Sequence, residues 1–207
     1  MNERGAKRAR GRVPDPERTT QTRQLILRAA LDSFLERGFE GTRMADVAAR
    51  AGLAKGTLYL HFADKQALFE FVLRELISEP LAAFRAVPPL AGDSARAVLE
   101  RLVLPLLRDL ERSGRAAVLR LIITEGGRFP ELAAMHRRLV IEPFLAAVRE
   151  KVAGSPALAA FERFPQLMVA PVIMAAVWNG LWGRQEQLDA AEVFSAFLDL
   201  VFGPGSC

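Results

Sequence analysis

The chain has 207 residues, enough for one or two small domains with a packed core, and its composition is ordinary for a globular protein. Lysine and arginine outnumber aspartate and glutamate by 28 to 24, and the resulting net charge of +4 permits a nucleic-acid partner without requiring one. A single cysteine, Cys207, excludes a disulfide framework and a cysteine-based metal site. The N-terminus lacks the apolar stretch of a signal peptide, and the longest apolar run, Leu167 to Trp178, is shorter than the roughly 20 residues of a membrane span. We therefore expect a cytoplasmic protein without a membrane segment.

In chain order, residues 1–21 predict a disordered basic arm, because they are polar and contain almost no large apolar side chains. From Thr22 the apolar residues recur with helical spacing, and no segment alternates as a strand does. Pro105 and Pro143 should kink the helices that contain them. The prediction is an all-α fold of about nine helices, at about 22–37, 43–51, 55–61, 65–86, 93–113, 115–125, 130–152, 165–184 and 190–202.

The segment from Gly38 to Phe62 has the features of a helix-turn-helix. Thr42 is a suitable N-cap for helix 43–51, whose small residues would let it cross closely over the helix before it. Gly52 permits a sharp turn, and helix 55–61 then opens with short polar residues and a cation, Lys55-Gly56-Thr57. Such an opening suits entry into a DNA major groove.

This segment resembles the DNA-binding domain of the TetR family of bacterial regulators. The likeness covers about residues 25–70, and the only departure from the family pattern that we note is Ala54, where the family often has serine; this could remove a cap or a phosphate contact. Residues 119–134 look like the C-terminal domain of AefR-like members. The matching residues are Gly38-Phe39, Gly41-Thr42, Asp46-Val47-Ala48, Ala51-Gly52-Leu53, Lys55 to Tyr59, His61-Phe62, Asp64-Lys65 and Leu68-Phe69.

Three parts follow from this resemblance: the arm 1–21, a three-helix DNA-binding domain at 22–66, and a ligand-binding and dimerisation domain at 67–207, connected by helix 65–86. It also implies the DNA contacts: Lys55 and Thr57 to bases or phosphates, and Tyr59 to a phosphate. Lys65 opposes the dipole of its own helix, which suggests an external anion. The candidate DNA-binding residues are Thr42, Arg43, Lys55, Gly56, Thr57, Tyr59, His61 and Lys65.

Each of these residues also has a structural explanation. Lys55 and Lys65 could be solvated lysines, Thr42 could serve only as a cap, and His61 could stack beneath the next helix as well as contact a phosphate. The backbone N–H groups at Thr42 and Arg43 could bind a phosphate in addition to any capping. Whether the basic arm enters a minor groove or is only a tail stays open.

In the C-terminal part, a few polar or aromatic residues lie among apolar ones and could line a pocket for a small-molecule inducer. They could equally be core or interface residues. The candidates are Thr124, His136, Gln166, Trp178, Asn179 and Trp182. No metal spacing or catalytic constellation involves the only two histidines, so we expect no metal, no cofactor and no enzymatic activity.

Helices 165–183 and 190–202 are the predicted dimer interface, because the first is apolar around its whole circumference. The small residues Ala176 and Gly180 would allow close approach of a second copy, although internal burial is the alternative. The prediction is a homodimeric transcriptional regulator that binds double-stranded operator DNA, and most simply a repressor released by an inducer. The alternatives are a non-specific DNA-organising protein, which the low net charge disfavours, and a helical carrier or enzyme.

Overall fold

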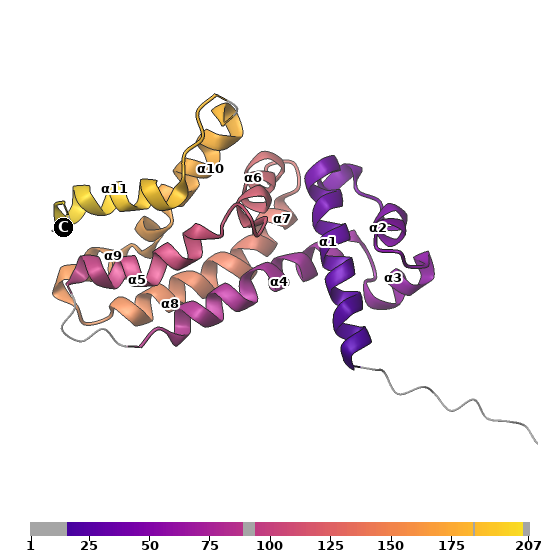
Figure 1. Ribbon diagram of the computed structural model, residues 1–207, viewed down its shortest axis with the longest axis horizontal. Helices are drawn as coiled ribbons and strands as arrows, with labels where there is room; N and C mark the ends of the chain where they lie inside the picture. Colours follow the sequence, from indigo (N-terminus) through magenta and orange to yellow (C-terminus); the bar gives the residue numbers. More distant parts are fainter. Residues whose placement is uncertain (1–15, 89–93, 184, 205–207) are drawn as a thin grey trace, which may run out of the picture.

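The computed structural model describes residues 16–88, 94–183 and 185–204, and Figure 1 shows that they are arranged as helices. The described residues contain no strand, so the all-α prediction is confirmed. If the continuous run α7–η1–α8 is counted once and the five-residue α9 is set aside, the number of α-helices agrees with the nine expected. The helices are α1 (Pro16–Gly41), α2 (Met44–Arg50), α3 (Lys55–His61), α4 (Lys65–Ala86), α5 (Ala95–Arg108), α6 (Arg115–Glu125), α7 (Pro130–His136), η1 (Arg137–Ile141), α8 (Glu142–Val152), η2 (Pro156–Leu158), α9 (Ala159–Arg163), η3 (Pro165–Met168), α10 (Ala170–Trp182) and α11 (Ala190–Phe202).

Helices α3, α4, α6 and α11 have the bounds expected from the sequence. Local signals explain this agreement. The Asp64 carboxylate accepts a hydrogen bond from the Ala67 N–H at 2.8 Å and so caps α4. Gly114, in the left-handed conformation at φ 80°, immediately precedes α6. As the alanine at position 54 suggested, α3 begins without a side-chain cap.

Other boundaries differ from the prediction. Helix α1 begins at Pro16, so residues 16–21 are helical rather than part of a disordered arm, and residues 1–15 lie outside the described part of the chain. The N-cap of α2 is Arg43 and not Thr42. The continuous run from α7 to α8 is interrupted by a π-helical turn that ends two residues before Pro143, the proline that was expected to kink this helix. The short helix α9 was not predicted.

Two hydrophobic cores organise the chain. The first joins the head, which we define as α1 to α3, to α4, α6 and α7, and its centre is an aromatic cluster in which the Phe34 and Phe69 rings are 5.0 Å apart. The second joins the C-terminal half of α4 to α5, α8, α9, α10 and α11 around Phe84 and Phe194, and we call α5 to α11 the body. Figure 1 shows the head at one end of the molecule and α4 leading from it alongside the body. Because the first core includes α6 and α7, the head is packed against the body as well as tethered to it.

Candidate nucleic-acid interface and apolar cavity

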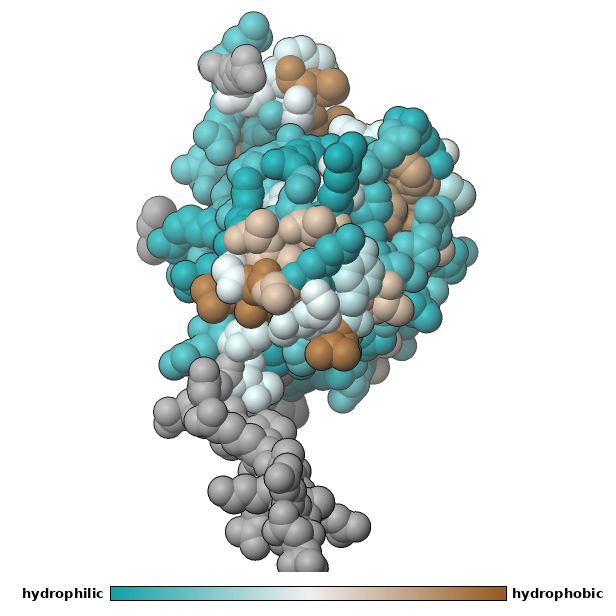
Figure 2. Space-filling view, turned by 90° about the vertical axis from the view of Figure 1, so that its right-hand side faces the viewer, coloured by the Kyte–Doolittle hydropathy of each residue, from teal (hydrophilic) through white to brown (hydrophobic). Residues whose placement is uncertain are grey.

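Helix α3 lies on the head with one side buried and the other open to solvent. Leu58 is fully buried and anchors the helix in the first core, whereas Lys55 and Gly56 are exposed and Thr57 is half-buried. Tyr59 is 45% exposed, and the Lys55 ammonium lies 5.8 Å from its ring centroid. The polar opening of α3 is therefore free to meet a partner, and Figure 2, which looks onto this end of the molecule, shows a mostly hydrophilic face with smaller hydrophobic areas.

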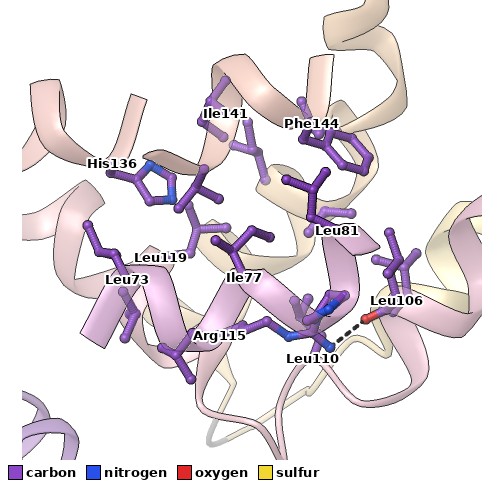
Figure 3. Close-up of a pocket in the computed structure, with 18 of the residues that line it drawn as sticks. Leu73, Ile77, Leu81, Leu106, Leu110, Arg115, Leu119, His136, Ile141 and Phe144 are labelled. Carbon is purple, nitrogen blue, oxygen red and sulfur yellow. Dashed lines mark hydrogen bonds between the residues drawn. The ribbon is translucent and has the colours of Figure 1, made fainter. Parts of the chain in front are cut away.

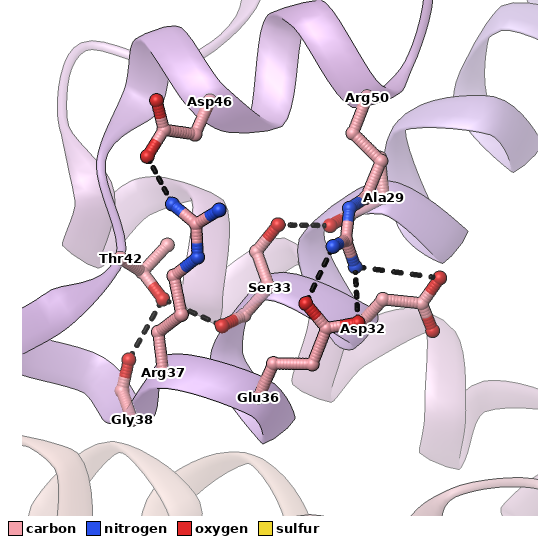
Figure 4. A network of polar contacts seen from close by, with 9 residues as sticks. All are labelled: Ala29, Asp32, Ser33, Glu36, Arg37, Gly38, Thr42, Asp46 and Arg50. Carbon is pink, nitrogen blue, oxygen red and sulfur yellow. Dashed lines mark hydrogen bonds and ion pairs between the residues drawn. The ribbon is translucent and has the colours of Figure 1, made fainter.

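Ion pairs fix α2 against α1, and so hold the turn that carries α3 (Figure 4). Arg37 of α1 pairs with Asp46 of α2, and Arg50 at the end of α2 binds the Glu36 carboxylate with a nitrogen–oxygen distance of 2.9 Å. This contact with Arg50 lowers the pKa of Glu36. Because α2 is only seven residues long, these cross-helix contacts supply orientation that so short a helix could not keep by itself.

Thr42 is buried, and its hydroxyl points into the head. The oxygen lies 2.7 Å from the Gly38 carbonyl and 3.0 Å from the Ser33 carbonyl (Figure 4). Because the hydroxyl is held by the end of α1, it neither caps α2 nor faces outward. Arg43 is exposed beside it, so a contact at the start of α2 would use the Arg43 side chain.

Lys65 has partners within the chain. Its ammonium donates to the Glu40 carbonyl at 3.0 Å and lies 4.5 Å from the centroid of the Phe39 ring. Partial burial lowers the pKa of Lys65, although the carboxylates of Glu40 and Glu125 oppose this shift. The unfavourable position of a cation at a helix start is thus compensated by the end of α1, without an external anion. His61 is exposed at the end of α3, beside Phe62.

An apolar cavity of about 150 Å³ lies between α4 and the body, and its wall comes from α4, α5, α6, α7, η1, α8, η3 and α10 (Figure 3). Leucine, isoleucine, valine and phenylalanine side chains form most of its wall, and the charged or titratable residues on it are Arg115 and His136. Burial lowers the pKa of His136 to about 4, so its imidazole is neutral at neutral pH. A site of this kind binds an apolar molecule and orients it through one or two polar contacts.

Of the six residues that the sequence suggested for a ligand, His136 lines this cavity and the others are not part of its wall. Asn179 exchanges two hydrogen bonds with the Leu188 backbone, at 2.9 and 2.8 Å, and Trp178 donates to the Glu186 carbonyl, so both fix the loop that follows α10. Thr124 bonds to carbonyls of its own helix, whereas Gln166 and Trp182 are exposed.

Sequence analysis missed Arg115. A signal was present, because Arg115 lies three and four positions before Val118 and Leu119 in the predicted helix 115–125 and therefore shares their apolar face. A cation at such a position is a candidate for the polar end of a buried site.

Helix α6 connects the cavity with the head. Its first half contributes Arg115, Val118 and Leu119 to the cavity wall. At its last residue the Glu125 carboxylate accepts a hydrogen bond from the Phe39 N–H of the head at 2.9 Å. One rigid element thus touches both the interior of the body and the segment that leads into α2.

Helices α10 and α11 expose large apolar side chains on the surface of the single chain. On α10, Ile173, Met174, Val177 and Leu181 are 37–65% exposed, and Leu200 of α11 is 87% exposed. Of the small residues that were expected to face a partner, Ala176 is 4% exposed and is buried within its own chain, whereas Gly180 is exposed.

Among the described residues, no helix is both long and apolar enough to cross a membrane. The same residues contain no group of three or more histidine, cysteine, aspartate or glutamate side chains that could hold a metal ion.

Comparison with known proteins points to one family. Residues 26–72 match the model for "Bacterial regulatory proteins, tetR family". The HTH-type transcriptional regulator UidR of Escherichia coli strain K12 is 32% identical over 127 residues, 60% of this chain and 63% of UidR. RutR of the same strain, also an HTH-type transcriptional regulator, is 40% identical over 99 residues, 45% of this chain and 44% of RutR. The matched region thus spans less than two thirds of each of these curated relatives.

The fold comparison extends beyond the head. The structure of Salmonella enterica GusR superimposes with a TM-score of 0.68 at 25% identity, covering 91% of this chain and 97% of GusR. The family model, the two sequence relatives and the structural superposition all point to a bacterial transcriptional regulator with this helix-turn-helix. Residues 26–72 of this chain therefore form a helix-turn-helix domain of the kind found in the TetR family of bacterial regulatory proteins.

Proposed function

We propose that this protein is a sequence-specific transcriptional regulator, a repressor that leaves its operator when a small molecule occupies the cavity in the body. The observation that supports this most strongly is the exposed polar face of α3, carried by a head that matches the TetR family model. The two relatives matched in sequence are transcriptional regulators, which favours this function over an enzyme or a carrier. Because a bacterial operator lies in the cytoplasm, the protein would act there.

In this proposal α3 enters the major groove. Lys55 and Thr57 contact bases or phosphates, with Gly56 leaving room for close approach, since a Cβ added there would meet nothing within 4 Å. Tyr59 gives its hydroxyl to a phosphate, and Arg43 reaches the backbone from the start of α2. His61 lies at the far end of the same exposed face. Thr42 would act indirectly, by holding the turn between α1 and α2, and Lys65 would contact DNA only with donors that Glu40 leaves free.

A dimer is required because one recognition helix reads too few base pairs to find one operator in a genome. We propose that α10 and α11 form the interface with a second copy, through Ile173, Met174, Val177 and Leu181 together with Leu200. Each has a large apolar side chain that a second copy would remove from water, a gain of about 25 cal/mol for every Å² buried. Two linked heads would then read the two halves of a near-palindromic site.

Helix α6 is the proposed route from ligand to DNA. A molecule in the cavity would press on Val118 and Leu119, and the displacement would reach Phe39 through the Glu125 hydrogen bond. Helix α4, which lines the cavity with Leu73 and leads directly from α3, would move with it. The ligand would shift the spacing of the two heads by preferring one of two arrangements of these helices.

The test uses the purified protein and double-stranded DNA from upstream of its own gene, with protection from nuclease digestion to locate the site and fluorescence anisotropy to measure affinity. We expect a protected inverted repeat that survives excess unrelated competitor DNA. Tyr59→Phe should weaken binding to all sequences alike, whereas Thr57→Val should change the preference among operator variants. Equal affinity for operator and unrelated DNA would favour a non-specific DNA-organising protein and reject the proposal.

A further inference from the structure

The wall of the cavity contains one half-buried cation, Arg115, whose hydrogen-bond donors are only partly used. The Arg115 guanidinium donates through Nε to the Ser113 hydroxyl at 2.8 Å. One terminal nitrogen donates to the Leu106 carbonyl at 2.9 Å, as Figure 3 shows. An arginine side chain has five N–H donors, and these two hydrogen bonds use two of them. The other three donors are available to a ligand. A guanidinium in apolar surroundings is costly unless all its donors are bound.

No carboxylate among the described residues forms an ion pair with Arg115. Asp109 and Glu79 act on it only from a distance, and Asp109 is itself paired with Arg112, with a nitrogen–oxygen distance of 3.4 Å. Burial lowers the pKa of Arg115 and outweighs the opposite effect of these two carboxylates. The guanidinium nevertheless stays protonated. The cavity therefore holds a positive charge that no carboxylate of the described ranges neutralises by contact.

The remaining wall determines what else the occupant must be. Leu73, Ile77, Leu81, Leu119 and Phe144 offer it only apolar surface. A cavity of about 150 Å³ is of the size that accepts a single aromatic ring, and His136, neutral at neutral pH, adds no second charge. The site combines a small apolar volume with one cation.

We propose that the cavity binds a small amphipathic carboxylate, whose ring or short alkyl chain lies among the apolar side chains and whose carboxylate is bound by Arg115. This inference rests on the proposed function, in that the same molecule would be the inducer. A planar guanidinium can bind a carboxylate through two parallel hydrogen bonds, and the low polarity of the cavity strengthens that contact. The bond to Leu106 positions the guanidinium for it, because it ties the side chain to the end of α5.

Three probes of equal chain length separate charge from hydrophobicity: octanoate, octan-1-ol and octylamine. Binding of each to the full-length protein is measured by isothermal titration calorimetry without DNA. We expect octanoate to bind at least about tenfold more tightly than octan-1-ol, the ratio typical of one charged hydrogen-bonded contact, and octylamine not to bind. Equal affinities for octanoate and octan-1-ol, or no binding of any probe, would overturn the assignment.

Two substitutions locate the effect. Arg115→Met removes the charge but keeps the length of the side chain, so it should abolish the preference for octanoate while octan-1-ol still binds. Arg115→Lys keeps the charge without the fork and should give an intermediate ratio; it serves as the decisive variant if Arg115→Met does not fold. Arg112→Met is the matched control, since it removes an exposed arginine three residues away and should leave the ratio unchanged.

The outcome can be separated from the proposed function. Operator binding by the unliganded protein is measured in parallel, and its absence would count against the regulator alone. If the operator is bound but octanoate has no advantage over octan-1-ol, the carboxylate inference fails and the proposed function stands.

Discussion

The contact between Gly38 and Glu125 offers a quantitative test of how the head is joined to the body. Gly38 has φ 71° and ψ 176°, a region that is essentially restricted to glycine, so Gly38→Ala should cost about 1–3 kcal/mol in backbone strain. The added Cβ would also lie 2.2 Å from Glu125 Oε1, which forces the carboxylate away. Its hydrogen bond with the Phe39 N–H would be lost, at about 1.5–3 kcal/mol for a charged partner. The expected total is about 2.5–6 kcal/mol.

Urea unfolding at one fixed protein concentration measures this loss. Gly52→Ala is the matched control, because Gly52 also has a positive φ, 68°, but a Cβ there meets nothing within 4 Å; it should cost about 1–2 kcal/mol. In the double variant Gly38→Ala with Glu125→Ala the clash disappears, so the two losses should not add. If Gly38→Ala cost no more than Gly52→Ala, or if the double variant were additive, the contact would not join head and body as argued.

Three further results are expected. Lys55→Ala should reduce the slope of log K against log salt by about two in a dimer, at about 0.9 for each lost phosphate contact. Lys65→Ala should change this slope less, because Glu40 and Phe39 hold the Lys65 ammonium. Equal slopes for the two variants in salt titrations of operator binding would contradict this expectation. Met174→Arg should be a monomer in analytical ultracentrifugation and should have little affinity for the operator. Ala146→Arg, at an exposed site of α8, should stay dimeric. A dimeric Met174→Arg protein would rule out α10 as the interface. The folded-state pKa of His136, about 4, lies below its unfolded value of 6.5, so the unfolded chain binds more protons between these values and stability should fall as pH decreases, by up to about 3 kcal/mol at the acid end. Urea midpoints between about pH 4.5 and 7.5 should therefore fall more steeply for the wild type than for His136→Gln, and parallel curves would refute the assignment.

Much of the fold follows from short-range signals. The bounds of α3, α4, α6 and α11 could be predicted because a cap, a glycine or a change in periodicity within a few residues decides where a helix ends. The helix-turn-helix was equally accessible, since its turn, its small crossing residues and the polar opening of α3 are contiguous in the chain. Pro143 predicted a disturbance of the helix at 130–152, but not that the disturbance would be a π-helical turn.

The surroundings of individual side chains depended on residues far away in the sequence. Thr42 was predicted as a cap, yet its hydroxyl is held by the end of α1, and Lys65 binds the Glu40 carbonyl, 25 residues before it. Ala176 was expected on a partner surface and is buried in its own chain. Lys65 and Ala176 do stand in helices that the sequence predicted, because the position of a helix depends on local periodicity. Only the tertiary structure decided what these side chains meet, since the neighbours come from other helices; Arg115 became a candidate ligand residue when α4, α5, α8 and α10 enclosed an apolar cavity around it.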